Sequence, residues 1–96
     1  MNTMINDPNT LTNDAVLEQV RQFVTESFLY RHPGLELADD ANLLELGIID
    51  SLGVVELVTE VEQQFEISVT DVDVTEENFG SIASVADYVR RRTAEA

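Results

Sequence analysis

Between residues 51 and 66, apolar side chains recur at every third or fourth position, and this spacing constrains the fold more than any other feature of the chain. The positions between them are mostly Glu or Gln, so a helix over this range has an acidic outer face. Ser51 is expected to cap it, because a hydroxyl can accept from an N–H group of the first turn. The apolar stripe comprises Leu52, Val55, Val58, Val61 and Phe65, widened by Val54 and Leu57.

Two further segments have helical periodicity. The first covers about 14–31 and stops at His32-Pro33-Gly34, because Pro cannot continue a helix and Gly tolerates positive φ. The second covers 81–94, after a short turn at 75–79. Residues 67–74 are rich in Val and Ile, but no second strand is available to pair with them, so we expect a packed connector.

These elements predict an all-α four-helix bundle with three long helices, one short helix and a long loop between helices one and two. We expect a single domain over 13–94, with a disordered tail at 1–12 and no linker that would suggest an excised module. The loop, about 33–50, is too apolar to extend into water and should pack over the helices. Its apolar residues are Leu35, Leu37, Leu43, Leu44, Leu46, Ile48 and Ile49.

The charge of the chain excludes several classes of partner. Its 96 residues include 5 basic and 19 acidic side chains, a net charge of −14. Nucleic acids and anionic membrane surfaces are polyanions, so neither is an expected partner, and self-repulsion favours a monomer. No apolar run is long enough for a membrane span, and the segment 1–13 does not resemble a secretory signal, so a cytoplasmic location is expected.

The residues offer little for catalysis or metal binding. The chain has one His, no Cys and only Arg as a base, so we expect a protein that is not an enzyme. Asp71, Asp73 and Thr75 alternate as at the start of a calcium-binding loop. Glu76 and Ile82 stand where such a loop needs Gly and a bidentate acid, so no metal site is expected.

Ser51 lies where a long loop enters an acidic helix, and it is either a simple helix cap or a modification site at the positive end of the helix dipole. A series of short motifs extends from this serine along the chain: Asp50-Ser51-Leu52, then Val55-Glu56-Leu57-Val58, Glu62, Phe65, Ile67, Val69, Thr70-Asp71, Ser81 to Ala83, and Asp87-Tyr88-Val89. With these motifs the chain resembles the acyl, aminoacyl and peptidyl carrier proteins, and the resemblance covers about 14–92.

The resemblance implies a covalent 4′-phosphopantetheine arm on Ser51, next to Asp50, which a phosphopantetheinyl transferase attaches from coenzyme A. The arm supplies the thiol that this chain lacks and holds cargo as a thioester. The implied partners are that transferase, an adenylate-forming ligase, and a downstream acyl or aminoacyl transferase or synthase. The implied docking face consists of Leu52, Val54, Glu56, Glu60 and Glu62.

Two departures from the fatty-acid carriers bear on the cargo. Ile48 and Ile49 place two residues between Gly47 and Asp50, where those carriers have one. Gly53, inside the helix, costs roughly 0.5–1 kcal/mol against Ala, and it reflects either drift or room for the arm or a partner. Both features resemble freestanding D-alanyl and aminoacyl carriers, so an amino acid or short acyl cargo is expected. A fatty-acid or polyketide carrier and an unmodified acidic interaction or inhibitor domain remain the alternatives.

Overall fold

The computed structural model describes residues 13–95, and this part of the chain contains helices and irregular segments but no strand. The predicted tail at 1–12 lies outside the described residues. The four α-helices are α1 (Asn13–Phe28), α2 (Ser51–Phe65), α3 (Glu76–Phe79) and α4 (Ile82–Glu95). The 3₁₀ helix η3 (Leu29–Arg31) extends α1, and η4 (Asp71–Asp73) lies in the connector before α3. The predicted all-α fold of three long helices and one short one is confirmed.

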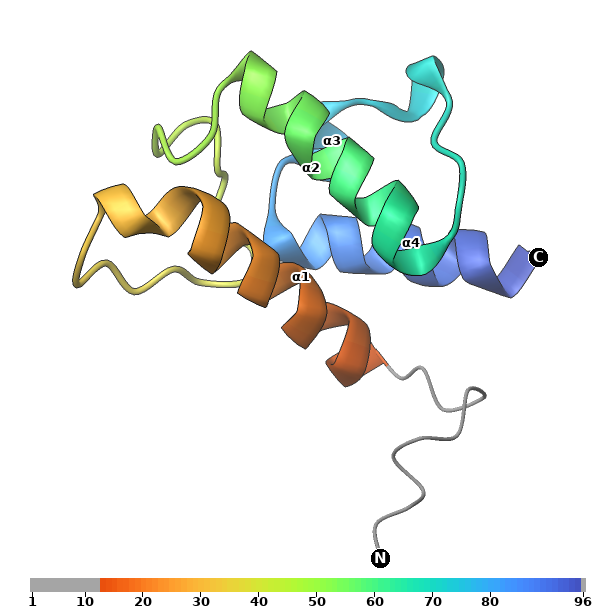
Figure 1. Ribbon diagram of the computed structural model, residues 1–96, viewed down its shortest axis with the longest axis horizontal. Helices are drawn as coiled ribbons and strands as arrows, with labels where there is room; N and C mark the ends of the chain where they lie inside the picture. The colour runs from red at the N-terminus through yellow and green to blue at the C-terminus, as the bar shows by residue number, and fades with distance from the viewer. Residues whose placement is uncertain (1–12, 96) are drawn as a thin grey trace, which may run out of the picture.

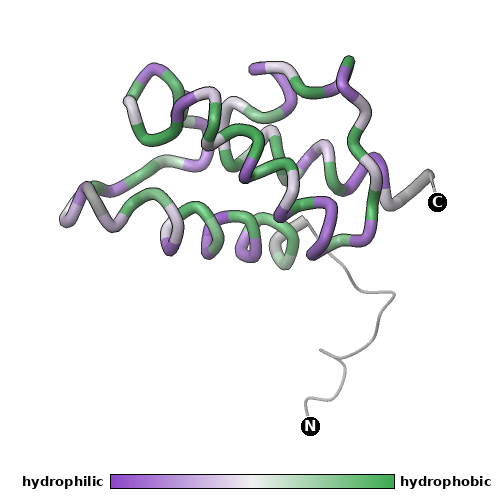
Figure 2. Tube along the Cα trace, turned by 45° about the horizontal axis from the view of Figure 1, so that its top comes forward, coloured by the Kyte–Doolittle hydropathy of each residue, from purple (hydrophilic) through white to green (hydrophobic). Residues whose placement is uncertain are grey.

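Helix α4 is the element on which the others pack. Its most extensive contact is with α1, and it also contacts α3 and α2 (Figure 1). Figure 2 shows the hydrophobic residues of α1 on the side that faces the other helices and the hydrophilic ones on the outer side. The largest fully buried side chains come from all four helices and the long loop: Phe79, Leu43, Leu57, Ile82, Val16, Val24, Val85 and Val89.

The long loop between α1 and α2 is held by backbone hydrogen bonds to the end of α3 and to the first turn of α4. Leu43 N–H donates to the Gly80 carbonyl at 2.8 Å, and Ala83 N–H donates to the Asp39 carbonyl at 2.8 Å. The Arg21 guanidinium on α1 also pairs with the Asp39 carboxylate. The loop therefore has a fixed path, and its end delivers the chain to the start of α2.

Only part of the predicted loop packing is correct. Leu37, Leu43, Ile48 and Ile49 are buried, whereas Leu35, Leu44 and Leu46 are exposed. The loop turns over 43–47, and two of the exposed leucines, Leu44 and Leu46, lie in this turn.

The buried face of α2 also differs from the predicted stripe. Leu57, Val58 and Val61 are buried, but Leu52 is 68% exposed and Val55 is 57% exposed. Helix α2 has apolar residues on more than one face, so periodicity alone could not identify the face that packs. Its first turns consequently present apolar side chains to solvent.

The connector between α2 and α3 is irregular, as predicted, and it is tied to both long helices beside it. The Glu62 carboxylate accepts from Val69 N–H at 2.8 Å, and the Tyr88 hydroxyl donates to the Asp73 carboxylate at 2.8 Å. Thr75 caps the short helix, since its side chain accepts from Asn78 N–H.

Candidate functional site

Asp50, and not Ser51, caps helix α2, which corrects the prediction from sequence. Asp50 has extended backbone angles, and its Oδ1 accepts from Gly53 N–H at 2.8 Å. The Asp50 carbonyl accepts from Val54 N–H at 2.9 Å, which is the first hydrogen bond of the helix. Asp and Ser are about equally good caps, so their adjacency left the sequence ambiguous.

Ser51 is therefore the first residue of the helix, and its side chain is exposed. Within residues 13–95 its hydroxyl makes no hydrogen bond, because Asp50 performs the capping. An exposed hydroxyl at this position lies near the free N–H groups and positive dipole end of α2, where an attached phosphate is stabilised. The local geometry therefore fits a phosphodiester on Ser51.

Exposed apolar side chains lie on the helix turn and the loop next to Ser51. Leu52 and Val55 from α2 lie near it in the chain, and Leu44 and Leu46 of the loop are 37% and 51% exposed. The sequence predicted Leu52 both as part of the packing stripe and as a docking contact, and it assigned Val55, Leu44 and Leu46 to packing alone. Leu44 and Val55 line one hollow together with Ser51, and Leu52 is its neighbour on the helix, so exposed apolar surface adjoins the serine, of the kind that marks an interaction site.

The three glutamates predicted for docking differ in their environments. Glu56 is exposed, Glu60 is half-buried, and Glu62 is half-buried with its carboxylate bonded to Val69 N–H. Glu62 therefore has a structural contact that its place in the sequence did not indicate. Val54, the predicted apolar contact, is half-buried.

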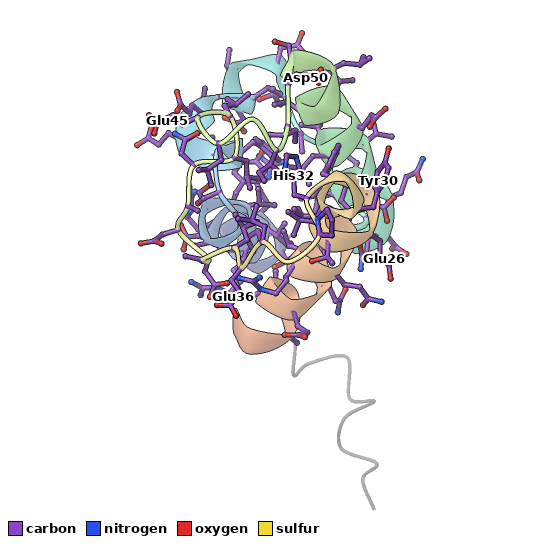
Figure 3. The ribbon with its side chains drawn as sticks, turned by 90° about the vertical axis from the view of Figure 1, so that its left-hand side faces the viewer. Glu26, Tyr30, His32, Glu36, Glu45 and Asp50 are labelled. Carbon is purple, nitrogen blue, oxygen red and sulfur yellow. The ribbon has the colours of Figure 1, made fainter. Side chains whose placement is uncertain are left out.

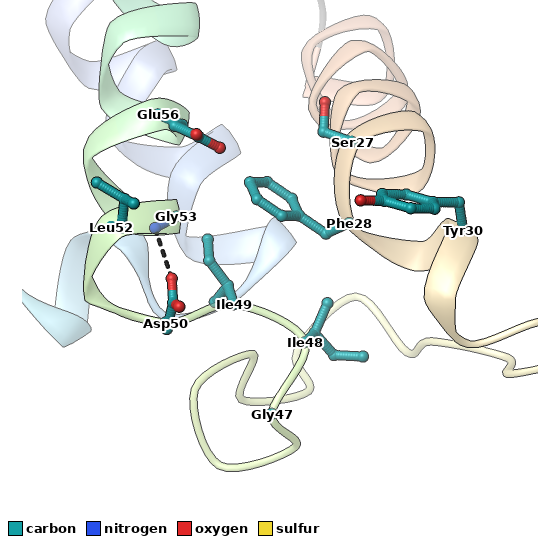
Figure 4. A pocket seen from close by; sticks show the side chains of 10 residues that line it. All are labelled: Ser27, Phe28, Tyr30, Gly47, Ile48, Ile49, Asp50, Leu52, Gly53 and Glu56. Carbon is teal, nitrogen blue, oxygen red and sulfur yellow. Dashed lines mark hydrogen bonds between the residues drawn. The ribbon is translucent and has the colours of Figure 1, made fainter.

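Two hollows flank the start of α2. One, of about 300 Å³, lies between α1 and α2 beside Asp50 and Leu52 (Figure 4). We call it the α1–α2 cleft, and its lining includes Ser27, Phe28, Tyr30, Ile49, Gly53 and Glu56. The other, of about 280 Å³, lies between α2 and α3 and is called here the α2–α3 groove. It is lined by Leu44, Ser51, Val54, Val55, Val74, Thr75, Glu76 and Phe79.

The loop end of the molecule, seen in Figure 3, is acidic at its edges. Glu36 and Glu45 point outward into solvent, and Asp50 lies at the start of α2. Among residues 13–95, no group of His, Cys, Asp or Glu side chains could hold a metal ion. No helix in the same range is long and apolar enough to cross a membrane.

An all-helical bundle with an exposed serine at the start of an acidic second helix defines the carrier-protein class. A model of the phosphopantetheine attachment site family matches residues 18–89, most of the chain. The chain therefore belongs to this family of carrier proteins, whose members are not themselves catalytic, carry a covalent 4′-phosphopantetheine group and interact with a modifying transferase and biosynthetic enzymes.

Known proteins similar to this chain include two D-alanyl carrier proteins. The one from Abiotrophia defectiva is 36% identical over 55 residues, which cover 57% of this chain and 70% of that protein. The one from Streptococcus uberis (strain ATCC BAA-854 / 0140J) is 35% identical over 51 residues, 53% of this chain and 65% of that protein.

A similar fold occurs in a solved structure described as "Crystal structure of FAD-dependent dehydrogenase". One chain of that structure is 28% identical to this one, with a TM-score of 0.60. The match covers 73% of this chain and 97% of that chain. The matched chain is therefore itself small, close in size to the bundle described here.

Proposed function

We propose that this chain carries an amino acid as a thioester on a 4′-phosphopantetheine arm attached to the Ser51 hydroxyl. The observation that carries the proposal is the free, exposed hydroxyl of Ser51 beside the capping Asp50, within a chain that matches the phosphopantetheine attachment site family. The similarity to two D-alanyl carrier proteins supports an amino acid as the cargo.

In this proposal the chain itself performs no chemistry on the cargo. When bound, the arm supplies a thiol, which no residue of this chain provides. An adenylate-forming ligase loads the thiol, and a downstream aminoacyl transferase or synthase removes the cargo. Tethering raises the effective concentration of the cargo at each docked active site.

The surface around Ser51 supports brief docking of such partners. Leu52 and Val54 offer apolar contact, and Glu56, Glu60 and Glu62 carry negative charge along the same helix. A partner with a basic surface would associate quickly and release readily, since exposed charges steer encounters and are screened by salt. Loading rates should therefore fall as ionic strength rises.

A flavin-dependent dehydrogenase is a second candidate for the downstream partner. The small matched chain in the solved structure of a FAD-dependent dehydrogenase favours it. Such an enzyme would move two electrons and two hydrogens from the tethered cargo to its flavin, leaving a double bond in the cargo. Loss of two hydrogen masses from the loaded protein would identify this step.

Mass spectrometry after incubation with a phosphopantetheinyl transferase, magnesium and coenzyme A tests the attachment. We expect the mass of one arm to be added to the wild-type chain and none to Ser51→Ala. No mass gain, or a gain that survives in Ser51→Ala, would overturn the proposal and favour an unmodified acidic interaction domain. A loading assay with amino acids, short acids and fatty acids then separates an aminoacyl carrier from a fatty-acid or polyketide carrier.

A further inference from the structure

We infer that the α1–α2 cleft binds the ammonium group of an aminoacyl cargo while the cargo is tethered to Ser51. The inference rests on the proposed function, because it requires an arm on Ser51 and an amino acid on that arm. It also states which cargo the cleft prefers. The attachment site at Ser51 does not by itself determine that preference.

The position of the cleft suits a folded-back arm. Asp50 and Leu52, which precede and follow Ser51, both line it. Ser51 itself lines the α2–α3 groove, so an arm anchored there reaches the cleft by passing over the first turn of α2. A turn of the arm around this end of the helix would bring its loaded end between α1 and α2.

The charge of the cleft suits a cation. Glu56 has no hydrogen-bonding or ionic partner within residues 13–95, and Figure 4 shows its carboxylate pointing from α2 toward α1. The residues that line the cleft include no Lys, Arg or His. An ammonium group would therefore meet an unpaired carboxylate with no competing positive charge.

The aromatic side chains add a second attraction. The Phe28 ring points into the cleft from the end of α1, and the Tyr30 ring points in from η3 (Figure 4). Phe28 is held by an edge-to-face contact with Phe23, whose ring centroid lies 5.8 Å away. The face of an aromatic ring attracts a cation, so the rings and Glu56 favour the same ligand group.

The size of the cleft suits a short side chain. Its volume of about 300 Å³ lies at the lower limit of small-molecule pockets. That volume equals roughly ten water molecules, which is room for an alanyl group and the end of the arm.

The α2–α3 groove does not offer the same ligand set. Ser51 lines this groove together with the apolar residues Leu44, Val54, Val55 and Val74. The one carboxylate in its lining, Glu76, already accepts from the Asn42 amide. An apolar cargo would favour this groove. The two hollows therefore distinguish a cargo that has an amine from one that lacks it.

The experiment compares two cargoes that differ only in the amine. A phosphopantetheinyl transferase attaches alanyl- or propionyl-phosphopantetheine, supplied as the coenzyme A thioesters, to ¹⁵N-labelled protein. Mass spectra before and after recording verify the modification of Ser51 and the intact thioester. Amide shifts of Phe28, Gly53 and Glu56 report on the cleft, and those of Val54, Val74 and Phe79 report on the groove.

We expect the cleft amides to shift in the alanyl form and not in the propionyl form. Glu56→Gln should abolish this difference, and Glu60→Gln, which removes the same charge one turn along α2, should retain it. Equal shifts for both cargoes, shifts confined to the groove, or no shifts at all would overturn the inference while leaving the carrier function intact. Failure of Ser51 to accept any arm would instead reject the proposed function and the inference with it.

Discussion

Ile49 occupies the space that a side chain on residue 53 would need. A Cβ on Gly53 would lie 2.5 Å from Ile49 Cγ1 and 3.2 Å from Phe28 Cε1, both too close for an undisturbed contact. The glycine inside α2 and the second isoleucine between Gly47 and Asp50 are therefore two sides of one packing arrangement. The close contact is within the chain, which provides a reason for Gly53 other than drift or the approach of a partner.

We expect Gly53→Ala to destabilise the protein. Overpacking costs about 1–3 kcal/mol, and the better helix propensity of Ala returns about 0.5–1 kcal/mol, so the net loss should lie in the range of about 0–2.5 kcal/mol, with a central value of about 1 kcal/mol. Urea unfolding followed by circular dichroism measures it. On an Ile49→Ala background, which removes Cγ1, the same change should be neutral or stabilising. A similar loss in both backgrounds would contradict the proposed contact.

The capping geometry at the start of α2 predicts that two neighbouring substitutions act differently. Asp50→Ala removes the acceptor for Gly53 N–H and should cost about 0.5–2 kcal/mol, whereas Asp50→Asn should retain most of the stability. Ser51→Ala removes an exposed hydroxyl that caps nothing, so it should stay within about 0.5 kcal/mol of the wild type. Thermal unfolding of the unmodified proteins measures these differences. A larger loss for Ser51→Ala than for Asp50→Ala would show that the serine is the cap after all.

The four helices could be predicted from the sequence because each has strong apolar periodicity or an evident stop. Gly34 is such a stop, since its φ of +85° is accessible to glycine at little cost. The cap of α2 could not be chosen, since Asp50 and Ser51 are both good caps and only the path of the loop decides between them. Likewise Leu52 and Val55 belong to a plausible inward stripe, and only the packing of α4 shows that they face solvent.

The candidate serine was predictable because it depends on a local motif. The α1–α2 cleft was not, because Phe28, Ile49 and Glu56 come together only when the long loop is folded back along α1. The contact of Glu62 with Val69 could not be predicted either, because it depends on the path of the connector.

Glu62 should behave differently from the other glutamates proposed for docking. Its carboxylate accepts from Val69 N–H, so Glu62→Ala should cost about 1.5–3 kcal/mol, the usual contribution of a hydrogen bond to a charged group. Glu62→Gln keeps an acceptor oxygen and should cost less. Glu56→Ala should leave the stability unchanged within about 0.5 kcal/mol. Urea unfolding measures all three variants, and an equal loss for Glu56→Ala and Glu62→Ala would contradict the structural role of Glu62.

The environment of Tyr88 predicts how the free energy of unfolding changes at alkaline pH. Its side chain is 2% exposed, and its hydroxyl donates to the Asp73 carboxylate. Burial, together with the hydrogen bond to Asp73, raises the pKa of Tyr88 to about 12. In the unfolded chain tyrosine has a pKa of about 10, so between about pH 10 and pH 12 the unfolded state loses this proton while the folded state keeps it. The stability contributed by Tyr88 is therefore complete below about pH 10 and is lost as the pH rises through about 12.

The loss should reach roughly 2–3 kcal/mol across this window. Urea unfolding of the wild type and of Tyr88→Phe at about pH 9 and about pH 12 measures it. Tyr88→Phe should be less stable near pH 9, because it leaves Asp73 without the hydroxyl, yet it should lose less on going to pH 12, because it has no proton to release. The guanidinium carbons of Arg91 and Arg92 lie 5.7 and 6.0 Å from the ring centroid of Tyr88. Both arginines keep their charge throughout this pH range, so they do not produce the difference between the wild type and Tyr88→Phe. Equal losses in the two proteins would show that Tyr88 is not the group that responds.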